Sequence, residues 1–105
     1  MAVTVEASPD SKEVTISVHG RFDHTLYRAF REAYSPYTAP GLRVVLNLGA
    51  TEFIDSSALG MLLQLREEVG GDTANISIRN CNPTLSKILR IANFQRLFTI
   101  ENSQT

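Results

Sequence analysis

The chain has 105 residues, a formal net charge of −1 and a single cysteine, Cys81, and its hydrophobic content of 43% is enough for a core without disulfides or metals. We expect residues 1–105 to form one domain. The near-neutral charge and the scattered lysines and arginines argue against nucleic acid or an anionic membrane as the partner. With no signal-peptide pattern and no run of about 18 apolar residues, the chain is predicted to be cytoplasmic, with no segment inserted in a membrane.

Two strands and a helix are predicted for the first forty residues. Apolar and polar residues alternate over residues 3–7 and 14–18, and the turn residues between them indicate an antiparallel hairpin. Gly20 is expected to end the second strand. From about residue 24 to 37 the period becomes that of a helix, whose apolar face is expected to be Leu26, Ala29, Phe30, Ala33 and Tyr37.

Two further strands and two further helices are predicted for the rest of the chain. The nearly continuous apolar run over residues 44–48 suits a central strand. Residues 55–69 give the clearest helix, and Ile76 and Ile78 a further strand. Asn82-Pro83 is a strong helix start. The apolar faces of these two helices are expected to be Leu59, Leu62, Leu63, Val69, Ala58 and Leu65 in the first, and Leu85, Ile88, Leu89 and Ala92 in the second.

The end of the chain is predicted to close the fold with a short helical turn and an edge strand over residues 94–100, followed by a frayed tail over 101–105. Strands separated by helices favour parallel neighbours joined by right-handed crossovers. We therefore predict the α/β class, with a mixed β-sheet of four to five strands and three to four helices.

Few residues are arranged for catalysis. His19 and His24 belong to no triad motif, and Cys81 is expected to be a small core or loop residue. The chain has neither the spacing of metal ligands nor a phosphate-binding loop. We expect no enzyme activity, no metal and no cofactor. A small enzyme or ligand-binding protein stays open as an alternative that would require a pocket with converging polar groups.

The segment that opens the clearest helix, Asp55-Ser56-Ser57, has two interpretations. Aspartate and serine are preferred helix caps, so these residues could serve only to start the helix. In the functional interpretation, Ser56 is exposed to a kinase, and a phosphate there adds about −1.5 to −2 charges. A helix N-terminus tolerates that charge, so phosphorylation would alter the surface beside Asp55 without melting the fold.

The sequence over residues 55–60, Asp-Ser-Ser-Ala-Leu-Gly, closely resembles the Asp-Ser-Ser-Gly-Leu-Gly signature of anti-sigma-factor antagonists, the STAS-domain family. Residues 20–23 are similar to the family's step from the second strand to the first helix. Residues 80–83 and 94–98 resemble its later landmarks, so the similarity covers nearly the whole chain. Ala58 replaces the usual glycine, and the fold should tolerate it because alanine favours helix.

This resemblance implies partner switching controlled at Ser56, which corresponds to the family's phosphorylated serine. The unmodified chain would bind an anti-sigma factor or related regulator that is also a serine kinase using ATP and magnesium, and would release it once phosphorylated. A metal-dependent serine phosphatase would restore the binding form, and the chain itself would need no cofactor. The partner-binding residues are expected to be Asp55, Ser56, Ser57 and Ala58, bordered by Asp23 and His24.

One alternative within the same fold stays open. The chain could be a constitutive accessory subunit of a transporter or of a larger signalling assembly, with Ser56 never phosphorylated and the same helix acting as a permanent interface. In either case we expect the isolated protein to be a monomer.

Overall fold

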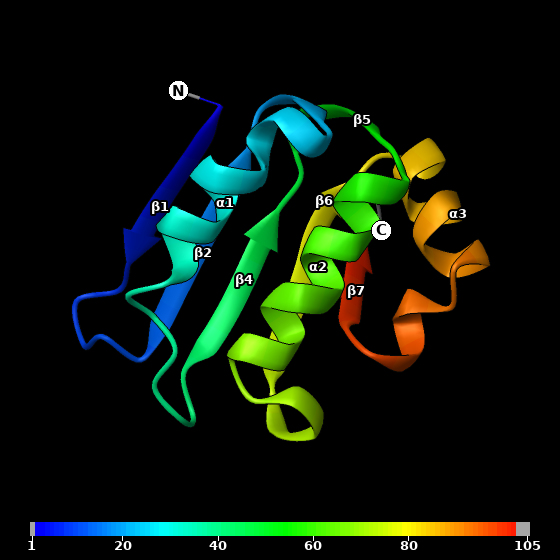
Figure 1. Cartoon of the computed structure of the whole chain (residues 1–105). Helices are drawn as coiled ribbons and strands as arrows, with labels where there is room; N and C mark the ends of the chain where they lie inside the picture. The colour runs from blue at the N-terminus through cyan, green and yellow to red at the C-terminus, as the bar shows by residue number, and fades with distance from the viewer. Residues whose placement is uncertain (1, 103–105) are drawn as a thin grey trace.

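A mixed five-stranded sheet with helices packed on it forms the body of the protein in the computed structural model, which describes residues 2–102 (Figure 1). Its strands are β1 Val3–Ala7, β2 Glu13–Val18, β3 Gly20–Phe22, β4 Arg43–Asn47, β5 Thr51–Ile54, β6 Asn75–Cys81 and β7 Thr99–Asn102. Its helices are α1 Tyr27–Tyr34, α2 Ser56–Glu68 and α3 Pro83–Ile91, with short 3-10 turns η1 His24–Leu26, η2 Gly71–Thr73 and η3 Phe94–Arg96.

The main sheet has the strand order β1-β2-β4-β6-β7, in which β1 is antiparallel to β2 and the other neighbours are parallel. The register places Ile16, Leu46 and Ile78 in one row across the three middle strands. All three side chains are fully buried, because α1 and α2 cover this face of the sheet (Figure 1). The structure therefore confirms the predicted hairpin, the central position of the 44–48 strand and the mixed sheet with three α-helices.

An aromatic cluster joins the end of β3 to α1. The ring of Phe30 lies 5.1 Å from that of Phe22 and 5.5 Å from that of Tyr34, measured between centroids. All three rings are buried, and such tilted pairs add to the stabilisation from the buried area itself. The cluster fixes where α1 begins relative to β3, which matters for the site described below.

The helix ends follow from local chemistry. The Asn82 side chain caps α3 by accepting a hydrogen bond from the Leu85 amide at 2.8 Å, and Pro83 takes the first helical position, as predicted. Two residues beyond Val69, the C-cap of α2, Gly71 begins η2 with a φ of +57°, a conformation that glycine adopts without strain. Within residues 2–102, no helix is long and apolar enough to cross a lipid bilayer.

Some predicted details are wrong. The strands β3 and β5 were expected to be a strand end and a loop. The predicted apolar faces included Ala29, Leu63 and Ala92, all of which are exposed, and omitted Tyr34, which is buried. Residues 101–102 belong to β7 rather than to a frayed tail, because β7 pairs with β6, and residues 103–105 lie outside the described part of the chain.

Candidate functional site

A separate two-stranded parallel ribbon, β3 with β5, builds the candidate site. Phe22 pairs with Ile54, so the aspartates that follow them, Asp23 and Asp55, come to the same edge of the ribbon. The ribbon is tied to the main sheet by the Thr51 hydroxyl, which donates a buried hydrogen bond of 2.7 Å to the carbonyl at the end of β2. The pairing thus brings together two loops that are some thirty residues apart in the chain.

Asp55 starts α2. Its backbone is extended, and its Oδ1 accepts a hydrogen bond from the Ala58 amide at 3.1 Å. This bond satisfies one of the free N–H groups at the helix N-terminus and confirms the predicted cap. Ser56 is the first residue of the helix and is exposed, whereas Ser57 is half-buried. Of the two adjacent serines, Ser56 is therefore the more accessible.

Ala58 was predicted to contact the partner, and its burial contradicts this prediction. Its side chain is fully buried, so it cannot touch a docked partner, and only its backbone amide takes part in the site through the Asp55 cap. The helical period explains the correction, since a residue three positions after the cap turns back towards the sheet. Ala58 stands where the Asp-Ser-Ser-Gly-Leu-Gly signature has a glycine, and its methyl group therefore faces the core.

Asp23 caps the turn η1 in a similar way. One of its carboxylate oxygens accepts hydrogen bonds from the Thr25 hydroxyl and, at 3.0 Å, from the Thr25 amide. These two bonds hold the pKa of Asp23 below its usual value of 3.8, because they favour the ionised carboxylate. His24 is exposed at the start of η1, beside Asp23.

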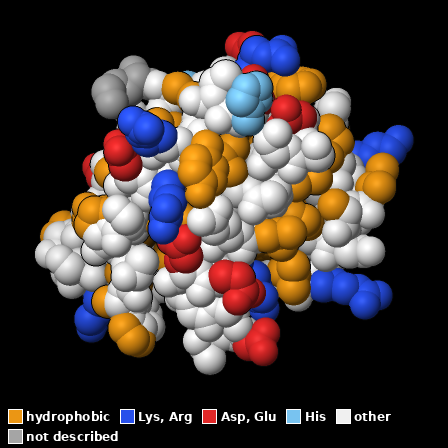
Figure 2. Space-filling view, in the orientation of Figure 1, with side chains coloured by type: hydrophobic (Ala, Val, Ile, Leu, Met, Phe, Trp, Pro, Cys, Tyr) orange, Lys and Arg blue, Asp and Glu red, His pale blue; other side chains and the backbone are white. Residues whose placement is uncertain are grey.

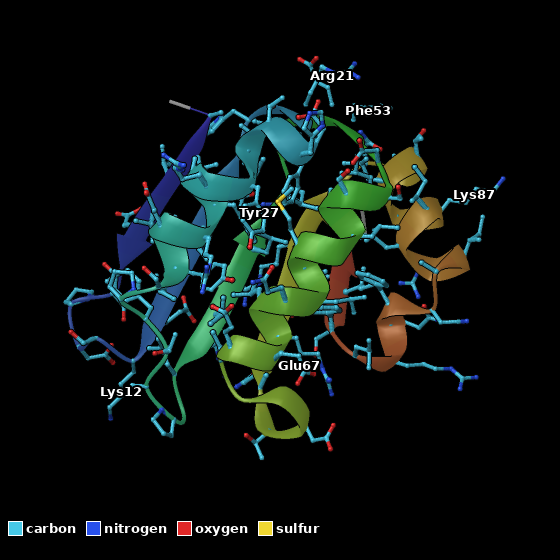
Figure 3. The ribbon with its side chains drawn as sticks, viewed as in Figure 1. Lys12, Arg21, Tyr27, Phe53, Glu67 and Lys87 are labelled. Atoms are coloured by element: carbon cyan, nitrogen blue, oxygen red, sulfur yellow. The ribbon has the colours of Figure 1, made fainter. Side chains whose placement is uncertain are left out.

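Arg21 and Phe53 are two site residues that the sequence prediction missed. They face each other across the ribbon, with the Arg21 guanidinium carbon 4.2 Å from the centre of the Phe53 ring (Figure 3). The same guanidinium lies 3.7 Å from the other Asp23 oxygen. Arg21 falls within the segment 20–23 that was singled out in the sequence, but only the pairing with β5 places an aromatic ring under it.

The exposed side of α2 continues from Ser56 away from the ribbon. We call Ser56, Gly60, Leu63 and Glu67 the α2 face, since their spacing sets them along one side of the helix. Gly60 opens to empty space, and the Leu63 side chain is 40% exposed. The α2 face therefore offers a serine at one end, an apolar middle and a carboxylate at the other end.

Tyr27 extends this surface onto α1. It lies on the side of α1 that faces α2 (Figure 3), the side from which Arg31 approaches Glu68 of α2 to 3.6 Å. The Tyr27 ring is exposed. In the space-filling view, apolar and charged side chains of both signs lie over this region and over the end of the molecule that carries the ribbon (Figure 2). A surface with a small apolar centre and a charged rim is typical of protein interfaces.

His19 and Cys81 are the remaining residues considered as candidates for catalysis. His19 is exposed, and Cys81 is buried at the end of β6, where burial raises the pKa of its thiol to about 11. Cys81 is thus a core residue, as predicted. In the part of the chain from Ala2 to Asn102, no three His, Cys, Asp or Glu side chains are grouped so that they could hold a metal ion.

Comparison with known proteins identifies the family. The sequence model of the family described as "Mlab, STAS domain" matches residues 5–99. A STAS-domain containing protein of Pseudomonas aeruginosa (strain UCBPP-PA14) is 47% identical over 100 residues, which cover 95% of this chain and 99% of that protein. Both matches span most of the chain.

Solved structures of anti-sigma factor antagonists share the fold. One from Mycobacterium paratuberculosis superimposes with a TM-score of 0.80 at 21% identity, covering 97% of this chain and 86% of that one. The antagonist SpoIIAA matches in its unphosphorylated form with a TM-score of 0.72 at 22% identity, covering 99% and 90% of the two chains. The phosphorylated Bacillus form matches at 0.71 and 21%, covering 98% and 94%. From the family model and the Pseudomonas relative, this chain belongs to the STAS-domain family.

Proposed function

We propose that this protein is a cytoplasmic, monomeric partner-switching regulator, whose STAS domain binds a serine-kinase partner when Ser56 is unmodified and releases it when Ser56 is phosphorylated. The observation that carries the proposal is the position of Ser56. It is exposed on the first turn of α2, next to the capping carboxylate of Asp55, and at the head of an exposed apolar helix face. A kinase can reach this hydroxyl without unfolding any part of the chain.

The charges around Ser56 support the proposal that one phosphate acts as a switch. Asp55 is held in place by the Ala58 amide, so a phosphate on the next residue would stand beside a fixed negative charge. The helix N-terminus stabilises such a charge in the free protein. A docked partner, however, would have to strip water from it, and the same group would then favour the free protein over the complex.

The expected size of this effect is sufficient for a switch. A desolvated charge left unpaired at an interface costs about 2–5 kcal/mol. Since about 1.4 kcal/mol corresponds to a factor of ten, the affinity should fall roughly 30- to several-thousand-fold. We propose that Asp55, Ser56, Ser57 and the rest of the α2 face contact the partner, with Asp23 and His24 at the border.

The kind of partner is proposed from the structural neighbours. SpoIIAA is named as an anti-sigma factor antagonist and has been solved in both unphosphorylated and phosphorylated forms. By analogy, the partner here is an anti-sigma factor or a related regulator that is itself a serine kinase, and a metal-dependent serine phosphatase resets the switch. The ATP site would belong to the kinase, so this chain would need no cofactor.

The decisive experiment measures the phosphorylation state of the protein in its native host. Intact mass and phosphate-affinity gels would compare wild type with Ser56→Ala, and with Ser57→Ala as the matched control on the neighbouring serine. A phosphorylated fraction that disappears only in Ser56→Ala supports the proposal. Loss of the phosphate only in Ser57→Ala would mean that Ser57 rather than Ser56 is phosphorylated, and would refute the proposal.

The binding form is tested with the same variants. Ser56→Ala should capture the kinase partner from the host as tightly as the unmodified wild type, whereas Ser56→Asp should capture it weakly. Absence of phosphate under every growth condition, together with equal capture by all variants, would instead favour the constitutive accessory subunit, in which the α2 face is a permanent interface.

A further inference from the structure

A second exposed surface lies on α3 and η3. Ile91, the last residue of α3, is 72% exposed, and Leu97, which follows η3, is 37% exposed. Three cations, Lys87, Arg90 and Arg96, are exposed on the same two elements. We call these five residues the α3–η3 face. It shares no residue with the α2 face.

The cations of the α3–η3 face have no counter-charge of their own. No aspartate or glutamate occurs between Asp72 and Glu101, and the Glu101 carboxylate accepts a 2.9 Å hydrogen bond from the Arg79 side chain. Among the described residues, none of the three makes an ion pair. Five other arginines do each have a carboxylate partner: Arg21, Arg31, Arg43, Arg66 and Arg79.

The arrangement of the face suits one elongated ligand. Lys87 and Ile91 are four residues apart on α3, so they lie one above the other on the same side of the helix. Lys87 points away from the body of the protein (Figure 3), and the side of the molecule that carries α3 presents only basic, apolar and neutral side chains in the space-filling view (Figure 2). An apolar anchor flanked by unpaired cations remains available for a partner.

We propose that the α3–η3 face docks an acidic amphipathic segment of a partner protein. Ile91 and Leu97 would receive the apolar side of that segment, and its carboxylates would pair with Lys87, Arg90 and Arg96. Charge complementarity of this kind selects the partner and speeds association. Because this face shares no residue with the α2 face, we expect it to be occupied whether or not Ser56 is phosphorylated.

The charge pattern favours an acidic protein segment over an anionic membrane or a nucleic acid as the ligand of this face. Polybasic sites for anionic lipids are clusters of about 4–8 lysines and arginines, and this face has fewer. Nucleic-acid-binding domains are usually basic overall, whereas this chain has a net charge of −1. An acidic segment with an apolar side uses both the cations and the exposed Ile91.

The test uses a defined probe on the full chain. A synthetic amphipathic helix with leucines on one side and flanking glutamates would be titrated into the labelled protein and followed by amide chemical shifts. We expect the shifts to map to α3 and η3. A matched peptide with glutamine in place of every glutamate should bind at least about tenfold more weakly, a difference of about 1.4 kcal/mol.

Single substitutions test which residues of the α3–η3 face bind the peptide. Ile91→Gln and Arg90→Glu should each weaken binding of the glutamate peptide about tenfold or more. Two controls should leave its affinity unchanged: Lys12→Glu, which removes an exposed cation at the opposite side of the molecule from Lys87 (Figure 3), and Ser56→Asp on the α2 face. All these positions are exposed, so the variants should fold. Shifts confined to the α2 face, equal binding of both peptides, or sedimentation with phosphatidylserine vesicles in preference to the peptide would each overturn the proposal.

Discussion

Replacing Ser56 by aspartate should make the free protein more stable while weakening its complex with the proposed kinase partner. Ser56 is the first residue of α2, so a carboxylate there faces the free N–H groups and the positive end of the helix dipole. A charge in this position stabilises a helix by about 0.3–1 kcal/mol. For a chain of this size, that corresponds to a rise in Tm of roughly 1–8 °C.

The matched control is Ser35→Asp. Ser35 is also exposed, but it is the C-cap of α1, where the helix dipole is negative and the same carboxylate is unfavourable. Thermal unfolding at low ionic strength should show a rise in Tm for Ser56→Asp and a fall of similar size for Ser35→Asp. Added salt should shrink both differences, because it screens exposed charges.

Opposite signs for stability and for affinity are the essential result. If Ser56→Asp lowered Tm, the loss of partner binding by this variant would be explained by damage to α2 rather than by charge at the interface. If instead Tm rose and the affinity for the proposed kinase partner stayed equal to that of wild type, a desolvated charge at Ser56 would not be what breaks the complex.

Three further predictions follow from the packing and capping of the site. Asp55→Ala should lower the free energy of unfolding by about 1 kcal/mol and Asp55→Asn by much less, because asparagine also caps helices; equal losses in urea unfolding would contradict the capping role. Leu62→Ala should cost about 2–5 kcal/mol in the same assay and Leu63→Ala under about 1 kcal/mol, since only the first side chain is buried; similar losses would mean that α2 is rotated. Titration by NMR should find the pKa of Asp23 below 3.8 in the wild type and a higher pKa in Thr25→Val; an unchanged pKa in the valine variant would refute the assignment to Thr25. Since the pKa of Asp23 is lower in the folded than in the unfolded protein, the stabilisation by this carboxylate is complete above the unfolded pKa and is lost as the pH falls through the folded pKa.

The parts of the fold that could be predicted are those with local signals. The start of α2 was predicted because aspartate and serine have a direct capping chemistry, and the start of α3 because asparagine and proline do. The alternation over β2 and the apolar run of β4 are long enough to show their period. In these segments, neighbouring residues in sequence determine the structure.

The ribbon could not be predicted, because its stability comes from distant partners. The strands β3 and β5 have three and four residues, too few for a recognisable period. They are held by long-range bonds, such as the amide of Gly20 to the carbonyl of Ala50 at 2.9 Å and the Thr51 hydroxyl to the Val18 carbonyl. No local pattern reports such bonds.

The errors in helix burial have a similar cause. Leu63 is an apolar residue of the core-forming type and follows the buried Leu62, but it is 40% exposed. Tyr34 lies outside the apolar face that the sequence predicts for α1, yet it is buried against Phe30. Helical periodicity gives the direction of the apolar side, whereas its width depends on which neighbours pack against it.

The pairing of β3 with β5 also determines what a modifying enzyme can recognise. Asp23 and Asp55 are separated in the chain by a whole helix and the central strand, and they share an edge only when the ribbon has formed. A short peptide around Ser56 would contain Asp55 but neither Asp23 nor Arg21. A kinase that reads both carboxylates would therefore ignore the unfolded chain and the excised peptide, so that the phosphate would mark only molecules that have completed their fold.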